Sequence, residues 1–167
     1  PLRSVYDSVF INYEEEDSGT TRQSQELLLG ELGDILVLYT ARDASAIAPY
    51  IEWKREKGFN VKALEIPVGT NPKSIIQSEY DLNNNLLYVQ IVGDWNDIKT
   101  DLDELESGPM DPALGCVAGI DDFPDLIVGR FSGNSANEIL IQVNKTINYE
   151  KSPDSGGNWY KYGLGIA

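Results

Sequence analysis

From residue 34 onward, the hydrophobic and polar positions change period in a regular order of strand-like and helix-like segments. Residues 35–39 and 86–92 are nearly continuous apolar runs, which are typical of strands covered on both faces. Residues 59–66 alternate like a half-exposed strand, and residues 125–131 read as a further strand. Strands that alternate with helices predict an α/β fold, here a three-layer sandwich with a mostly parallel sheet of about four strands.

Three helices are predicted between and after these strands. Residues 45–57 place apolar side chains three and four positions apart and end in a basic turn, which suits the negative end of a helix. Residues 71–80 open on an Asn-Pro pair, a helix-start pattern. Ser135 and, three positions later, Glu138 form a capping box, so we expect a helix over residues 135–151.

The pattern divides the chain into three parts. Residues 1–33 have no period long enough to predict an element, although short apolar stretches there could pair as an edge strand. Residues 34–151 carry the α/β pattern, interrupted by a loop of residues 95–114 that is rich in Asp, Glu, Gly and Pro. Residues 152–167 are a Pro/Gly/Ser linker followed by the start of a strand, and a chain that stops within a strand is expected to be a piece of something longer.

The composition of the chain limits the kinds of molecule that it is expected to bind. The chain of 167 residues is 41% hydrophobic, enough for one domain with a real core. Its formal net charge of −14 would repel phosphates, so we expect no nucleic-acid partner and no anionic membrane. Divalent cations and basic partners remain compatible with it. No apolar run approaches the length of a membrane span.

The residue types needed for histidine–cysteine catalysis are missing. The chain has no histidine and a single cysteine, Cys116, in an apolar stretch. Without a base to activate it, we expect Cys116 to be a buried, inert thiol. Tyr50 and Trp53, at helical spacing, are expected in the core, and Arg130 could pair with an acidic loop.

Four segments together resemble the gingipain family of cysteine endopeptidases. In chain order they are IEWKREKGF (51–59), YVQIVGD (88–94), GIDDFPDLIVGRF (119–131) and INYEK (147–151). The resemblance implies a caspase-like catalytic domain of two subdomains, of which this chain would be the first plus the opening strand of the second. The catalytic histidine and cysteine would lie beyond Ala167. It also implies a bacterial protein that is secreted or at the cell surface, with residues 1–33 similar to a precursor junction.

The resemblance further implies a structural calcium site. Its ligands would be the side chains of Asp94, Asp121 and Asp125 and the backbone carbonyls of Ala118 and Phe123. Calcium prefers about six to eight oxygen ligands, and converging carboxylates without a basic partner favour a divalent cation. The lack of histidine disfavours zinc. The alternative is that these are ordinary loop carboxylates that cap turns.

These patterns favour a non-catalytic, calcium-stabilised subdomain of a gingipain-like endopeptidase. Its partners would be the remaining half of the catalytic domain and, through that half, protein or peptide substrates. One alternative is an inactive homologue that serves secretion or adhesion. Another is a receiver- or flavodoxin-like domain that uses Asp94 for magnesium or phosphate. Against the latter, the first predicted strand is not followed by an acidic pair, and the chain has no glycine-rich phosphate loop.

Overall fold

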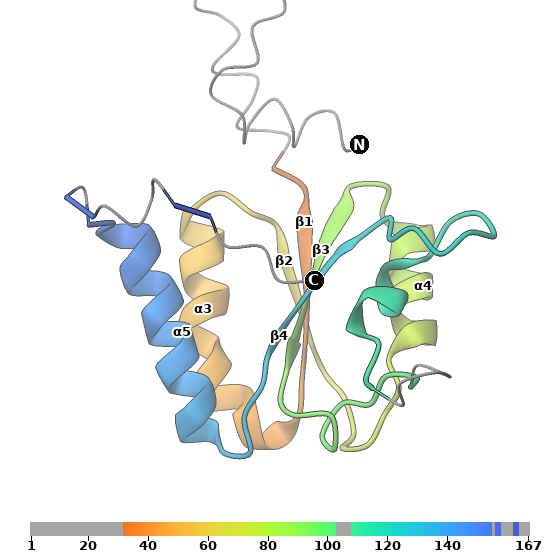
Figure 1. Cartoon of the computed structure of the whole chain (residues 1–167), viewed down its shortest axis with the longest axis horizontal. Helices are drawn as coiled ribbons and strands as arrows, with labels where there is room; N and C mark the ends of the chain where they lie inside the picture. Colours follow the sequence, from red (N-terminus) through yellow and green to blue (C-terminus); the bar gives the residue numbers. More distant parts are fainter. Residues whose placement is uncertain (1–31, 103–107, 155, 158–161, 164–167) are drawn as a thin grey trace, which may run out of the picture.

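The computed structural model describes residues 32–102, 108–154, 156–157 and 162–163. Its centre is a four-stranded sheet in the order β2-β1-β3-β4, with every neighbouring pair parallel (Figure 1). The strands are β1 (Asp34–Tyr39), β2 (Val61–Glu65), β3 (Leu86–Val92) and β4 (Ile127–Phe131). The helices are α3 (Ala44–Glu56), α4 (Lys73–Leu82) and α5 (Ala136–Lys151), with 3-10 turns η2 (Ala41–Asp43) and η3 (Asp111–Gly115). The predicted α/β sandwich with a parallel sheet is therefore confirmed.

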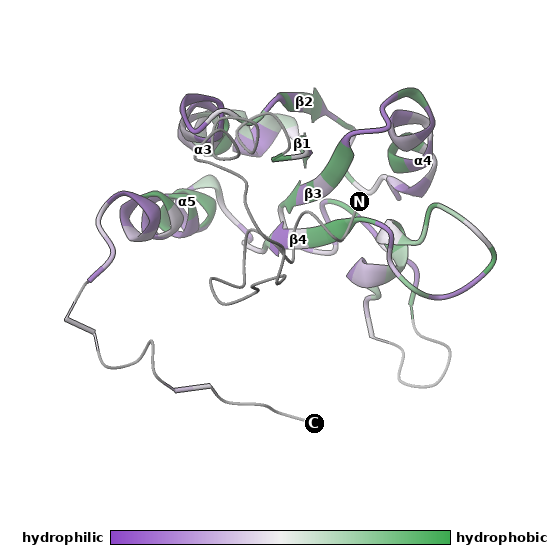
Figure 2. Ribbon diagram, turned by 90° about the horizontal axis from the view of Figure 1, so that it is seen from above, coloured by the Kyte–Doolittle hydropathy of each residue, from purple (hydrophilic) through white to green (hydrophobic). Residues whose placement is uncertain are grey.

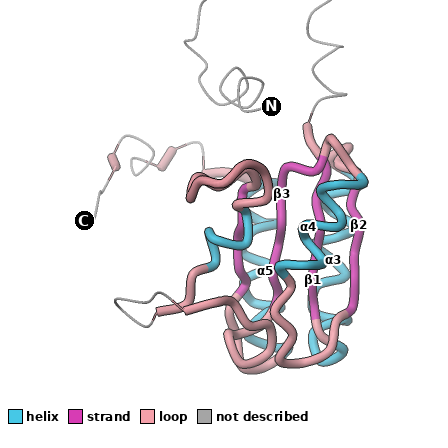
Figure 3. Tube along the Cα trace, turned by 90° about the vertical axis from the view of Figure 1, so that its right-hand side faces the viewer, coloured by secondary structure: helices cyan, strands magenta, loops and turns pink. Residues whose placement is uncertain are grey.

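Helices cover the sheet on both faces, which gives three layers. The face that carries Leu36, Leu38 and Ile91 packs against α4 and η3 (Figure 2). The opposite face, with Ile35 and Val37, packs against α3 and α5. Alternate residues of one strand therefore enter two separate cores, which explains why the β1 and β3 sequences are apolar almost throughout. Figure 3 shows the sheet behind α4, with loops gathered at both ends of the strands.

Two strands are shorter than the sequence pattern predicts, each for a local reason. At β2, the Phe59 amide donates to the Lys54 carbonyl at 3.1 Å. This amide caps the end of α3 and is therefore not available for pairing with β1. Gly58, with φ of 93°, makes this left-handed helix end possible. At β4, the Asp125 and Leu126 amides both donate to the Gly115 carbonyl, at 2.8 and 3.2 Å, so pairing with β3 begins only at Ile127.

The predicted cap of α5 is present in a modified form. The Ser135 side chain accepts from the Glu138 amide at 3.4 Å, as expected of an N-cap. The Glu138 carboxylate reaches back one residue further than in a standard capping box and accepts from the Asn134 amide at 2.8 Å. From this start, α5 places the fully buried Ile139 and Val143 on the sheet beside α3.

Several expectations fall on residues outside the described ranges. These are the edge strand expected in the N-terminal segment and the strand expected to start after the linker within residues 152–167. The loop predicted over residues 95–114 contains η3, whose Leu114 is 2% exposed. Of the helices in the described ranges, none is both long enough and apolar enough to cross a membrane.

Candidate functional site

Arg42 is the central side chain at the carboxyl end of the sheet. Its guanidinium donates two hydrogen bonds to Asp43 (3.0 and 2.8 Å) and two to Asp97 (3.0 and 2.8 Å). It also donates to the carbonyls of Gly133 and Asn134. Hydrogen bonding to Asp43 raises the pKa of Arg42 against the opposing effect of burial. One side chain thus joins the segments that follow β1, β3 and β4.

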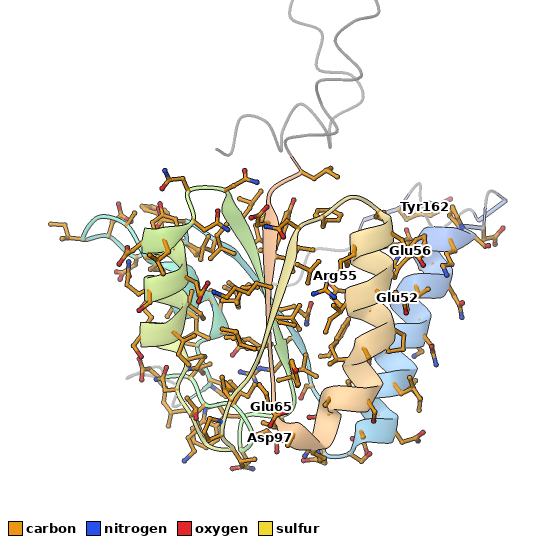
Figure 4. All side chains as sticks on the ribbon, turned by 180° about the vertical axis from the view of Figure 1, so that it is seen from behind. Glu52, Arg55, Glu56, Glu65, Asp97 and Tyr162 are labelled. Carbon is orange, nitrogen blue, oxygen red and sulfur yellow. The ribbon has the colours of Figure 1, made fainter. Side chains whose placement is uncertain are left out.

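This pairing bears on the receiver-like alternative. Asp43 is fully buried and Asp97 is 13% exposed at the side chain, and both are paired with the single positive charge of Arg42. Figure 4 labels Asp97 and Glu65, the last residue of β2, both at this end of the sheet. In that alternative Asp94 would bind magnesium or accept phosphate, and a magnesium ion there would need further open carboxylates, whereas Asp43 and Asp97 are committed to an arginine.

A second arginine, Arg130, lies nearby on β4. It forms a two-point ion pair with Asp111 of η3 (Nε to Oδ2 2.7 Å, Nη2 to Oδ1 2.8 Å). The expected pairing of Arg130 with an acidic loop is thereby confirmed. Its Nη1 also donates to the carbonyls of Gly93, Asp94 and Ile98. Arg130 therefore anchors the loop that follows β3.

The five predicted calcium ligands do not come together. Asp94 follows the carboxyl end of β3, whereas Asp125 precedes the amino end of β4. Because Tyr88 pairs with Ile127 and Val92 with Phe131, these two residues lie beyond opposite ends of a parallel ladder that itself spans about 13 Å. In the described part of the chain, no group of three or more acidic or cysteine side chains is placed to hold a metal. The structure thus places Asp94 apart from the other four residues.

The other four predicted ligands share one loop. The Asp125 Oδ2 accepts from the Val117 and Ala118 amides, at 2.9 and 2.7 Å, and the Asp121 Oδ1 accepts from the Phe123 amide at 3.1 Å. These contacts are the turn-capping role that was the alternative for these carboxylates. Together with Tyr80 of α4, residues 121 and 123–125 line a hollow of about 240 Å³. Calcium binding to this loop stays a prediction.

Cys116 is not fully buried, contrary to expectation. It follows η3 in a turn, is of intermediate exposure, and its thiol lies 3.9 Å from the Pro112 carbonyl. The turn directs the apolar neighbours Leu114 and Val117 into the core and leaves Cys116 at the surface. With no histidine in the chain, this thiol has no imidazole base.

The outer side of β4 is open among the described residues. β4 is an end strand of the sheet, and its Ile127 is 44% exposed. Beside it, on the face covered by α3 and α5, is a hollow of about 310 Å³ lined by Tyr50, Phe59, Tyr88 and Ile127. An unpaired strand beside an apolar hollow is the usual form of a surface that another segment covers.

Sequence reasoning missed the seam between α3 and α5. The Glu150 carboxylate accepts hydrogen bonds from Trp53, Lys54 and Lys57, at 2.9, 2.7 and 2.9 Å. Burial opposes ionisation of Glu150, but these hydrogen bonds outweigh it and lower its pKa. Burial also raises the pKa of Tyr50 to about 12. Tyr50 is in the core as expected, while Trp53 is only half-buried on this seam. The basic end of α3 was visible in the sequence, but its acidic partner lies about ninety positions away.

Comparison with known proteins shows which protein family this chain matches. The family model described as peptidase family C25 matches residues 30–167. Gingipain R2 of Porphyromonas gingivalis is 29% identical over 174 residues, which cover 99% of this chain but only 22% of that protein. The chain thus spans about a fifth of the length of this relative.

Solved structures give the same grouping. A structure described as a protease superposes with a TM-score of 0.65 at 28% identity and covers 73% of this chain and 29% of its own. The crystal structure of the Arg-specific cysteine proteinase gingipain R gives a TM-score of 0.64 at 25% identity, covering 71% and 29%. The four-stranded sheet and its helices are therefore similar to part of these peptidases.

Proposed function

Because the chain belongs to peptidase family C25, we propose that it is the non-catalytic, sheet-bearing part of a cysteine endopeptidase. The parent polypeptide would supply the histidine and cysteine from another segment. In support, these 167 residues contain no histidine, and their one cysteine lies at a surface turn without an imidazole base. The substrates of the parent would be proteins or peptides.

The observation that carries this proposal is the open side of β4. α3 and α5 cover the same face of the sheet (Figure 1), yet the hollow beside Ile127 is left uncovered by the described residues. Apolar side chains there include Tyr88 and Phe59, which stack edge-to-face at 6.0 Å between centroids. The rest of the catalytic domain is the proposed cover of this surface.

Topology supports a separate second unit. The connection through α3 leads outward from β1 to β2, whereas α5 begins after β4 on the same face. Crossover connections in one sheet keep one hand in nearly all proteins. A crossover through α5 with the hand of the β1–α3–β2 unit would lead back toward β3, whose sides are already paired. The residues after α5 are therefore proposed to start a new sheet.

The chemistry would then belong to the parent enzyme. A cysteine thiolate would attack the scissile carbonyl and form an acyl-enzyme, and a histidine would donate a proton to the leaving amine. The residues of this chain would act indirectly, since a sheet fixed by Arg42 and Arg130 would hold the adjoining unit in one position. Secretion or a cell-surface location is a further part of the proposal, based on the resemblance to gingipains.

The test is Ile127→Asp in the complete parent polypeptide, with Ile141→Asp as its matched control. Both isoleucines are about half exposed, at 44% and 48%, but Ile141 lies on α5 away from the hollow. Ile127→Asp is expected to lower hydrolysis of a mixed fluorogenic peptide library by at least about tenfold, because a charge at a covered apolar contact is costly. Ile141→Asp should leave hydrolysis unchanged.

Three results would count against this proposal. Equal hydrolysis by the two variants would show that no other part of the parent covers the surface around Ile127. A large loss of stability from Ile127→Asp in the present chain alone would show that the residue acts within this unit. No hydrolysis by the parent itself would favour the inactive homologue that serves secretion or adhesion.

Calcium stabilisation is a separate part of the proposal and is confined to the loop of residues 118–125. That loop contains the carboxylates of Asp121 and Asp125, which accept from the amides of Phe123 and Ala118, and carboxylate and backbone carbonyl oxygens are the ligand types that calcium prefers. Asp121→Asn is expected to lower the melting temperature in calcium and to change little in EDTA. An equal drop in melting temperature in calcium and in EDTA would show that Asp121 does not act through calcium.

A further inference from the structure

We propose that Arg130 holds the loop after β3 as a built-in cation, so that this end of the sheet needs no metal ion. The resemblance places a calcium ligand at Asp94, the first side chain of that loop. The geometry around Asp94 does not fit a metal, and it does fit an arginine. Residues 93–98 form this loop, and the role of Arg130 in holding it is independent of the proposed peptidase function.

The oxygen atoms around the Arg130 guanidinium are of the kind that usually surround calcium. Nη1 donates to the carbonyls of Gly93, Asp94 and Ile98, at 3.0, 3.3 and 3.1 Å. Nε and Nη2 bind both carboxylate oxygens of Asp111. Three backbone carbonyls and one carboxylate thus converge on a single positive group whose side chain is 11% exposed. Calcium sites use the same mixture of carbonyls and carboxylates.

The carboxylates of the same region are occupied by other partners. The Asp94 Oδ1 accepts from the Ser132 hydroxyl at 3.0 Å. The Asp97 Oδ2 accepts from the Asp94 amide at 2.9 Å, and Asp97 is also paired with Arg42. A metal ion bound by Asp97 would have to displace the Arg42 guanidinium, and one bound by the carbonyls of Gly93, Asp94 and Ile98 would have to displace Arg130.

Lys73 shows the same arrangement in the segment before β4. Its ammonium group donates to the carbonyls of Ala113 and Cys116, both at 2.6 Å. The neighbouring Gln77 on α4 donates to the Val117 carbonyl at 3.0 Å. Side-chain cations therefore satisfy clustered carbonyls on both sides of η3. A covalently attached cation has no dissociation equilibrium, and arginine stays charged across the physiological pH range.

The test is hydrogen–deuterium exchange of the whole chain, read by mass spectrometry on peptides that cover residues 93–100. Backbone amides that report on this loop include those of Gly93, Asp97 and Ile98, which donate to backbone carbonyls. In the unmodified chain, protection is expected to be the same in calcium chloride and in EDTA. Arg130→Met should lower protection by at least about tenfold, since hydrogen bonds to a charged group are lost.

Lys99→Met is the matched control, because Lys99 is an exposed cation in the same loop whose ammonium lies 5.0 Å from the Trp95 ring centroid. It should leave protection unchanged. If Arg130→Met does not fold, Arg130→Lys keeps the charge but loses the two-point pairing and should give intermediate protection. Protection of this loop that rises in calcium in the unmodified chain would overturn the proposal. So would unchanged protection in both Arg130 variants.

Residues 118–125 report on calcium separately in the same experiment. A calcium effect confined to that loop would support the calcium part of the proposed function and would leave the role of Arg130 intact. A calcium effect on residues 93–100 would overturn the role of Arg130 alone.

Discussion

The two ends of the sheet are built differently. At the carboxyl end, Arg42 and Arg130 each join acidic side chains and backbone carbonyls from segments far apart in the sequence. At the amino end, Asp34 accepts from three neutral amides, those of Asn60, Asn83 and Asn85. Large apolar side chains there point into solvent: Leu82 at 82% exposure, Ile120 at 106% and Phe123 at 79%.

The two ends of the sheet are therefore expected to differ in rigidity and in the amount of exposed apolar surface. Two-point ion pairs, in which both partners are charged, are stronger and more directional than single hydrogen bonds from neutral amides to a carboxylate, so the carboxyl end is expected to be the more firmly held. The amino end keeps its loops tied by weaker contacts and leaves apolar side chains exposed. The predicted metal ligands were divided between these two ends, which is why they do not converge.

The largest expected effect is that of Arg42→Met at the carboxyl end. Removing the guanidinium leaves the fully buried Asp43 carboxylate without its charged partner. The free energy of unfolding is therefore expected to fall by about 3 kcal/mol. Urea denaturation followed by circular dichroism measures the loss. Arg55→Met is the control, because exposed Arg55 makes one hydrogen bond to the Val61 carbonyl (Arg55 is labelled in Figure 4). A loss for Arg42→Met no larger than for the control would contradict the central role of Arg42.

A smaller, pH-dependent effect is expected for Glu150→Gln, where α3 and α5 end near the amino end of the sheet. At neutral pH, Glu150→Gln is expected to lower the free energy of unfolding by about 1–2 kcal/mol, because Lys54 and Lys57 lose their shared carboxylate. The folded-state pKa of Glu150 is lowered from its ordinary value of 4.5, so its contribution is present above that pH. It is lost as the pH falls through the folded-state pKa. Melting curves from pH 7 down to pH 3 should therefore converge for the two proteins, and a constant difference would contradict the assignment.

The smallest effect is expected for Ile120→Ser in the exposed loop. Its side chain is fully exposed, so the substitution removes no buried surface and should change the free energy of unfolding by less than about 0.5 kcal/mol. Ile139→Ser, at a fully buried position of α5, is the contrasting variant and should destabilise strongly. A substantial loss from Ile120→Ser would show that the loop packs against another part of this chain.

The sequence by itself determined the sheet, the helices and the family. Apolar runs such as residues 86–92 give β3 with its observed bounds, and Ser135 gives the start of α5, because both signals act over a few neighbouring residues. Only the tertiary structure decided which charges meet. Arg42 lies 55 positions from Asp97, and Trp53 lies 97 positions from Glu150, so no local pattern pairs them. The separation of Asp94 from Asp125 likewise follows from the parallel register of β3 and β4, a property of the assembled sheet.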